Sequence, residues 1–173
     1  MILIVGGVSG SGKTTVGALI AGRLGWGFAD ADDFHPAANV AKMRSGTPLT
    51  DSDRLPWLRS ISSWMDERIA AGESEVLACS ALKRSYRDIL LSGRERGDAV
   101  VAYLDVPRAE LEHRLTSRHG HFFPERLLNS QLADLELPGT DEPAVTVPVT
   151  GSVSETAEAV LSALKAAGLT LEA

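Results

Sequence analysis

The chain has 173 residues, of which 44% are hydrophobic and 23% are charged, a balance typical of one globular domain with a buried core. Its 23 acidic residues outnumber its 17 lysines and arginines, and the net charge of −6 is opposite in sign to that of proteins that bind nucleic-acid phosphates. The apolar runs are only a few residues long, too short to span a membrane, so we expect a soluble domain that binds neither nucleic acid nor membrane.

Short apolar runs alternate along the chain with stretches of helical periodicity. The runs suit strands buried on both faces of a parallel sheet, and they cover residues 2–5, 27–29, 76–79, 100–104 and 145–149, the second being the weakest. The helical stretches cover residues 14–24, 55–71, 83–92, 108–117, 124–135 and 154–167. This alternation predicts a three-layer α/β fold with a five-stranded parallel sheet and right-handed crossovers. Residues 30–53 and 117–124 fit neither pattern and are predicted as long functional loops.

Residues 7–14 (GVSGSGKT) match the pattern G-x-x-x-x-G-K-[ST] completely, between a predicted strand and a predicted helix. The glycines let backbone N–H groups point at phosphate oxygens, and the helix start adds a positive end. Lys13 is expected on the β- and γ-phosphates, and the Thr14 hydroxyl is expected to ligate Mg²⁺. The predicted ATP-binding residues of this phosphate loop are Gly7, Val8, Ser9, Gly10, Ser11, Gly12, Lys13, Thr14 and Thr15.

Three classes of protein carry such a loop: GTPase switches, motor-like ATPases and small-molecule kinases. The Asn-Lys-x-Asp sequence of guanine recognition is absent, and the strand 76–79 runs into Ser80 and Ala81 rather than into the acidic pair of motor ATPases. A kinase needs positioning, cations, a metal ion and a carboxylate that orients the acceptor. The remaining motifs supply these groups, which favours a kinase.

Carboxylates follow the second predicted strand in residues 30–36 (DADDFHP). Alternate side chains at a strand end project to the same side, so Asp30 and Asp32 can share a site for a metal ion and a hydroxyl group. Phosphoryl transfer to an alcohol uses one carboxylate near Mg²⁺ and another that accepts the hydroxyl proton. The structural alternative is an acidic cap for the next helix, which suits Asp33.

The segment 39–58 (NVAKMRSGTPLTDSDRLPWL) resembles the gluconate kinase family, small phosphate-loop kinases of sugar acids related to shikimate and adenylate kinases. The resemblance continues in residues 79–83 (CSALK), 86–88 (YRD), 118–122 (RHGHF) and 130–131 (SQ), and it extends from about residue 4 to about residue 160. Asp33-Phe34 and Leu91 depart from the usual pattern, but neither change removes an expected catalytic group.

This resemblance implies Mg²⁺-dependent transfer of a phosphoryl group from ATP to D-gluconate, giving 6-phospho-D-gluconate for gluconate catabolism, in a homodimer. Asp32 would accept the hydroxyl proton, and Asp30 would serve the water shell of Mg²⁺. Because arginine holds a carboxylate through two parallel hydrogen bonds, cations should bind the acid end of gluconate. The expected acceptor-binding residues are Asp32, His35, Lys42, Arg44, Arg54, Ser80, Lys83 and Arg87.

Structural alternatives remain open for four of these acceptor-binding residues. His35 can equally brace its loop beside Pro36, and Ser80 can be a simple turn residue. Arg44 and Lys83 can be solvated surface charges.

Residues 117–126 resemble the small helical lid that closes over the nucleotide in this family. Arg118 is expected to stabilise charge on the transferred phosphoryl group, which makes it catalytic with Lys13 and Asp32. Arg114, one helical turn earlier, is expected to pack on the adenine. Residues 1–173 would form a single kinase domain, with the phosphate loop at 7–14, an acceptor-binding segment at about 30–58 and the lid at about 117–126.

The one cysteine, Cys79, has no second cysteine with which to form an internal disulfide, which is typical of a reducing compartment. Residues 1–6 lack the basic and long apolar regions of a secretion signal. These features predict a cytoplasmic protein.

Two other functions fit the sequence. One is a phosphate-loop kinase of another small sugar acid, a shikimate-like acid or a nucleotide. The other is a nucleotide-gated binding protein that hydrolyses ATP slowly. Release of ADP that depends on an added acceptor separates these functions.

Overall fold

The computed structural model describes residues 1–95, 97–117, 125–169 and 171. Within these residues, five parallel strands form one sheet in the order β2-β3-β1-β4-β5, which confirms the predicted sheet. The strands are β1 (Ile2–Gly6), β2 (Gly27–Asp30), β3 (Glu75–Ala78), β4 (Ala99–Asp105) and β5 (Ala144–Pro148). The central strand β1 is buried at every position, as expected for a parallel strand covered on both faces.

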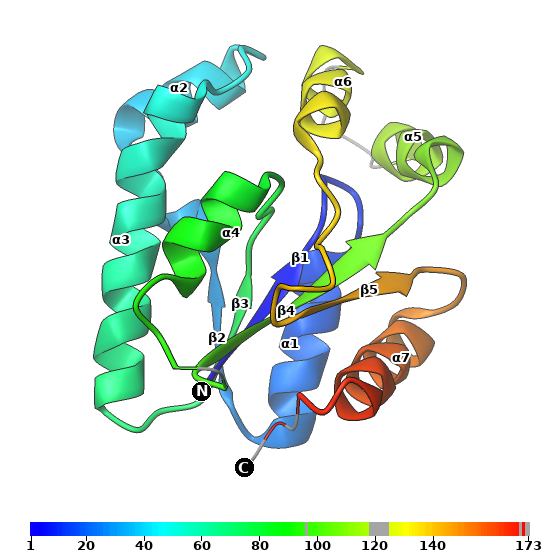
Figure 1. Cartoon of the computed structure of the whole chain (residues 1–173). Coiled ribbons are helices and arrows are strands. Elements are labelled where there is room, and N and C mark those ends of the chain that lie inside the picture. Colours follow the sequence, from blue (N-terminus) through cyan, green and yellow to red (C-terminus); the bar gives the residue numbers. More distant parts are fainter. Residues whose placement is uncertain (96, 118–124, 170, 172–173) are drawn as a thin grey trace.

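Helices cover both faces of this sheet, so the sheet is the middle of three layers (Figure 1). The helices of the described residues are α1 (Lys13–Leu24), the 3₁₀ turn η1 (Ala31–Phe34), α2 (Ala37–Arg44), α3 (Asp51–Ala70), α4 (Arg84–Leu91), α5 (Arg108–Ser117), α6 (Glu125–Asp134) and α7 (Val153–Ala166). Successive residues of β1 point to opposite faces. Leu3 and Val5 pack in one core with α1 and α7, while Ile2 and Ile4 pack in a second core with α3 and α4. None of the helices within the described ranges is long and apolar enough to cross a membrane.

The segment 30–53, predicted as irregular, contains η1, all of α2 and the start of α3, so this prediction is wrong in detail. The α3 helix begins at Asp51, four residues before the apolar periodicity, because Thr50 and Asp53 form a reciprocal capping box. The sequence also suggested that Asp33 could cap the helix that follows β2, but a different residue caps η1. The Asp30 carboxylate does so, accepting a hydrogen bond from the Asp32 backbone N–H at 3.0 Å.

The carboxyl ends of parallel strands meet at one edge of a sheet, where α/β proteins bind their ligands. Here that edge carries the loops after β1, β2 and β3, with α2 and α6 above them (Figure 1). The predicted phosphate loop and the predicted acidic segment are therefore neighbours in space.

Candidate active site

The loop between β1 and α1 has a backbone that favours glycine. Gly7, Gly10 and Gly12 have φ values of +152°, +85° and +91°, which other residues rarely adopt. A Cβ atom on Gly7 would lie 2.4 Å from the Ser11 Oγ atom, so a side chain cannot be added there without displacing the loop. The loop therefore keeps the open backbone that a phosphate group requires.

The two residues predicted to serve a metal ion lie side by side. The Thr14 hydroxyl donates a hydrogen bond to Oδ2 of Asp30 at 2.8 Å, and Oδ1 of Asp30 is held by the Asp32 N–H. Hydroxyl and carboxylate oxygens are the ligands that Mg²⁺ prefers, usually beside phosphate oxygens and water. No cluster of three or more His, Cys, Asp or Glu side chains suited to a metal occurs in the described part of the chain. Thr14 and Asp30 thus place two oxygen groups of the kind that bind Mg²⁺ next to the phosphate loop.

A cavity of about 790 Å³ opens beside the phosphate loop. Its walls come from the phosphate loop, from η1 and His35, from α2 with the turn that follows it, from α3, from the segment after β3, and from α6. Among the described residues that line it, one is acidic, Asp32, and four are basic: Lys13, Arg44, Arg54 and Arg126. The acidic protein thus has an electropositive cavity, which suits an anionic ligand.

Two residues that line the cavity are Asp32 of η1 and His35, which directly follows η1. Trp57 of α3 supports this segment through Ala31 and His35. The indole N–H of Trp57 donates to the Ala31 backbone oxygen at 2.6 Å, and its ring stacks on His35 with centroids 4.4 Å apart. The Asp32 side chain is 71% exposed. Its carboxylate therefore remains accessible to a ligand while its backbone is fixed.

We expect Trp57→Phe to keep a ring beneath His35 but to remove the N–H that the buried Ala31 carbonyl accepts. Leaving this carbonyl without its donor should lower the free energy of unfolding by about 1–3 kcal/mol, measured by urea denaturation. Trp64→Phe is the matched control, because Trp64 packs edge-on against Phe34 with centroids 5.6 Å apart. Equal losses in the two variants would show that the Trp57 hydrogen bond contributes nothing.

Arg54 lines the cavity but is already partly neutralised. Its Nη1 donates to Tyr86 Oη at 3.0 Å and to Asp134 Oδ2 at 2.9 Å. Lys83 joins the same cluster, with its Nζ 2.9 Å from Asp51 Oδ1 and 3.3 Å from Asp134 Oδ1. Hydrogen bonds from Tyr86 and Lys83 hold the pKa of Asp51 below its ordinary value. The cluster ties α3, α4 and the end of α6 together, and Lys83 does not line the cavity.

Lys42 also has a structural partner. Its Nζ contacts both carboxylate oxygens of Asp53 at 2.8 Å, and these contacts with the Thr50 N–H lower the pKa of Asp53 to about 2. Lys42 therefore links α2 to the capping box of α3 and lies outside the lining of the cavity. Of the other predicted acceptor-binding residues, the structure places Asp32, His35, Arg44, Arg54 and Ser80 around the cavity.

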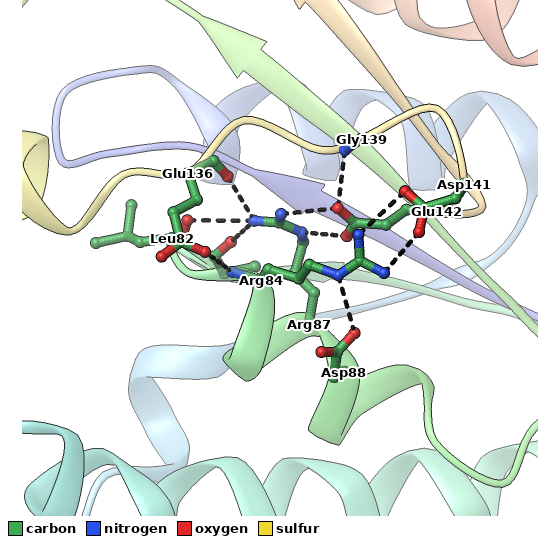
Figure 2. A network of polar contacts seen from close by, with 9 residues as sticks. Leu82, Arg84, Arg87, Asp88, Glu136, Gly139, Asp141 and Glu142 are labelled. Carbon is green, nitrogen blue, oxygen red and sulfur yellow. Dashed lines mark hydrogen bonds and ion pairs between the residues drawn. The ribbon is translucent and has the colours of Figure 1, made fainter.

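Arg87, another predicted acceptor-binding residue, lies away from the cavity in a network of buried polar contacts (Figure 2). Its side chain is fully buried, and its Nε and Nη2 atoms donate to Glu142 at 2.6 and 3.0 Å. Its Nη1 atom donates to three backbone oxygens, those of Ala81, Leu82 and Glu136. The guanidinium thus fastens the segment after α6 to the start of α4 and does not line the cavity.

Helix α6 contributes two residues whose roles the sequence did not predict. The Gln131 Oε1 atom accepts a hydrogen bond from the Ser9 N–H at 2.7 Å, and its Nε2 donates to Ser9 Oγ at 3.1 Å. Arg126 donates to the Ser45 backbone oxygen at 2.8 Å. Gln131 is 122 positions from Ser9 along the chain, and Arg126 is 81 positions from Ser45. The Ser-Gln pair at 130–131 was recognisable as a motif, but no local signal tied it to the phosphate loop.

Arg114 and the predicted lid belong to the side of the site where the nucleotide is expected. Arg114 pairs with Glu110, and its Nη1 lies 3.4 Å from the backbone oxygens of Gly10 and Ser11, against the phosphate loop. Arg118 and residues 119–124 of the predicted lid lie outside the described residues. Cys79 is buried, which raises the pKa of its thiol to about 12. It is therefore an inert core residue.

Comparison with known proteins relates this site to kinases. Residues 2–138 match the protein family described as an AAA domain. A gluconokinase of Gluconobacter oxydans (strain 621H) is 53% identical over 148 residues, which are 84% of this chain and 80% of that protein. A sugar kinase structure from Janibacter sp. HTCC2649, without ligand, is 43% identical, has a TM-score of 0.88 and covers 99% of this chain and 98% of its own. A gluconokinase structure from Sinorhizobium meliloti 1021 is 42% identical, has a TM-score of 0.84 and covers 95% and 91%.

Proposed function

Because the chain belongs to the gluconokinase family and is a kinase, we propose that it transfers the γ-phosphoryl group of ATP to the primary hydroxyl of D-gluconate. The products would be ADP and 6-phospho-D-gluconate. The observation that carries this proposal is the cavity, which joins one carboxylate and four cations to the phosphate loop. D-Gluconate is a chain of hydroxyl groups that ends in a carboxylate, so it needs cations at one end and a proton acceptor at the other.

In this reaction, the catalytic residues would be Lys13 and Asp32. The Asp32 carboxylate takes the proton of the primary hydroxyl as the hydroxyl oxygen forms its bond to phosphorus. Lys13 neutralises charge on the transferred group, and the backbone N–H groups of the loop hold its oxygens. Thr14 and Asp30 would hold Mg²⁺, which supplies further charge neutralisation when it is bound.

The carboxylate of gluconate would bind the cations at the α2 and α6 walls. Arg44 and Arg126 line the cavity, and neither forms an ion pair with an acidic residue within the described part of the chain. Arg54 forms an ion pair with Asp134, and its remaining charge would add to the positive potential of Arg44 and Arg126. Arg118 would also stabilise charge on the transferred phosphoryl group, and this role rests on the family resemblance alone.

The remaining predictions also rest on the resemblance and on composition. They are Mg²⁺ dependence, a homodimer, a cytoplasmic location, a role in gluconate catabolism, and a single kinase domain with an acceptor-binding segment at about 30–58 and a lid at about 117–126. They stay predictions.

An assay of ADP release tests the proposed function. The full chain, with ATP and Mg²⁺, is given D-gluconate, other aldonic acids, shikimate or nucleoside monophosphates in turn. We expect D-gluconate to stimulate ADP release most strongly, with equimolar 6-phosphogluconate as product. Absence of stimulation by D-gluconate overturns the proposal. Stimulation by a different acid identifies a related kinase, and slow ADP release without any acceptor favours a nucleotide-gated binding protein.

We expect Arg126→Met to raise the KM for gluconate about 10- to 100-fold, because a hydrogen bond to a charged group contributes roughly 1.5–3 kcal/mol. The KM for ATP should change less than about twofold, since α6 contacts the phosphate loop through Gln131 instead. Steady-state kinetics with each substrate varied in turn measures both constants. Arg59→Met, at an exposed position of α3, is the control. An unchanged KM for gluconate in Arg126→Met removes Arg126 from carboxylate binding.

A further inference from the structure

Asn39 is a buried amide beside the cavity, and the proposed reaction does not use it. The residue is 3% exposed and lies between His35 and the start of α3. Its Nδ2 atom donates to the Asp53 backbone oxygen at 2.8 Å. Because a carbonyl oxygen can only accept, this bond determines which end of the Asn39 amide is the NH₂ group.

The orientation of Asn39 in turn determines where the proton of His35 lies. Nδ2 of Asn39 is 3.3 Å from Nδ1 of His35. An amide NH₂ only donates, so Nδ1 must accept and carries no proton. A neutral imidazole then carries its proton on Nε2.

The environment of His35 keeps the ring neutral and fixed. Its side chain is 4% exposed, and its plane lies 11° from that of Trp57. Burial lowers the pKa of His35 below its ordinary value, with Arg54 acting in the same direction and Asp32 opposing it. The ring is therefore a rigid hydrogen-bond donor at neutral pH, with Nε2–H as its remaining polar group.

Nε2 lies on the side of Asp32, at 3.9 Å from Oδ1, and both residues line the cavity. This separation is too long for a direct hydrogen bond. It does fit an oxygen atom between them, because an oxygen about 2.8 Å from each would have its two partners at an angle of roughly 90°. A hydroxyl is the group that can accept from Nε2–H and donate to the carboxylate at once.

We propose that Asn39 and His35 form a hydroxyl-recognition unit, in which Asn39 fixes the Nε2–H tautomer of His35 and His35 donates to the acceptor hydroxyl whose proton faces Asp32. His35 is then a substrate-binding donor and cannot be the base. Asn39 is a positioning residue that touches no substrate. The identity of the hydroxyl as that of gluconate rests on the proposed function, whereas the tautomer does not.

NMR of the full chain labelled with ¹⁵N-histidine tests the tautomer without any substrate. We expect the His35 signals of the wild type to show a protonated Nε2 and an unprotonated Nδ1, with His35→Gln used to assign them. In Asn39→Asp, the new carboxylate should draw the proton onto Nδ1. Asn129→Asp, at an exposed position of α6, should leave the His35 signals unchanged. A protonated Nδ1 in the wild type, or an unchanged tautomer in Asn39→Asp, overturns the role of Asn39.

Kinetics tests the donor role of His35. His35→Gln places an amide NH₂ close to the position of Nε2, and His35→Phe keeps the stacking on Trp57 but removes the donor. We expect kcat/KM for gluconate to fall about tenfold in His35→Phe and less than about threefold in His35→Gln, since one hydrogen bond is involved. Equal losses in both variants overturn the donor role. If the wild type does not use gluconate at all, the proposed function fails, and the NMR result still decides the tautomer.

Discussion

Asp32→Asn should lower kcat for gluconate phosphorylation by about 10²- to 10⁴-fold, the range for removal of a general base. Asp32 is the one carboxylate among the described residues that line the cavity, and an amide of the same shape cannot accept a proton. The side chain is 71% exposed, so the change should not disturb folding. The KM for ATP should stay near that of the wild type, because the backbone N–H of Asp32, which the variant retains, makes the contact to Asp30.

Two further variants show whether the loss of kcat is specific to the Asp32 carboxylate. Asp33→Asn is the same change at the adjacent exposed carboxylate, which does not line the cavity, and it should leave kcat within about twofold of the wild type. Asp30→Asn weakens the oxygen pair with Thr14, so its loss of activity should be partly restored by high Mg²⁺. The loss in Asp32→Asn should persist at every Mg²⁺ concentration. Near-normal turnover of Asp32→Asn, or its rescue by Mg²⁺, excludes Asp32 as the base.

The fold and the phosphate side of the site were predictable because their signals are local. The runs 2–5 and 100–104 are apolar at every position, which is the pattern of a strand buried on both faces. The phosphate loop is a single contiguous motif, and Thr14 and Asp30 lie at the carboxyl ends of β1 and β2, which share one edge of the sheet with β3 between them. The start of α3 was misplaced by four residues because apolar periodicity does not register a capping box.

The cationic side of the site was predicted less well, because a cation's role depends on its partner. Lys42, Lys83 and Arg87 occur in family motifs just as the cavity-lining Arg44 and Arg54 do, yet they lie outside the lining of the cavity. Their charges face Asp53, Asp51 and Glu142 instead. These carboxylates lie 11, 32 and 55 residues away along the chain. No spacing rule connects such pairs. Arg126 was overlooked for the converse reason, because only the folded chain brings α6 over the cavity.

Arg87→Met and Glu142→Gln should each lower the free energy of unfolding by about 3–5 kcal/mol, the range for removal of one partner of a buried ion pair. Either change leaves a charged group without its partner, at side chains that are 0% and 3% exposed. For a domain of this size, the loss corresponds to a fall in Tm of about 6–20 °C. Thermal unfolding followed by circular dichroism measures it.

An exposed ion pair next to the buried one supplies a matched control (Figure 2). Arg84 is one helical turn from Arg87 and pairs with Asp141 at 2.7 Å, but these side chains are 48% and 63% exposed. Arg84→Met should therefore cost less than about 1 kcal/mol. Similar losses in Arg84→Met and Arg87→Met would show that burial does not distinguish the two pairs.

The pH dependence of the loss identifies the charge of Glu142 as its cause. Burial alone would raise the pKa of Glu142, but hydrogen bonds from Arg87 and from the Gly139 N–H outweigh it and hold the pKa below its ordinary value. A carboxylate with a depressed pKa in the folded state stabilises the protein above its unfolded pKa, and this stabilisation is lost as the pH falls through the folded pKa. The difference in Tm between the wild type and Glu142→Gln should thus be constant from neutral pH down to about pH 5 and should shrink below about pH 4. A difference that stays constant into strong acid would mean that packing around Glu142, rather than its charge, stabilises this junction between α4 and the segment after α6.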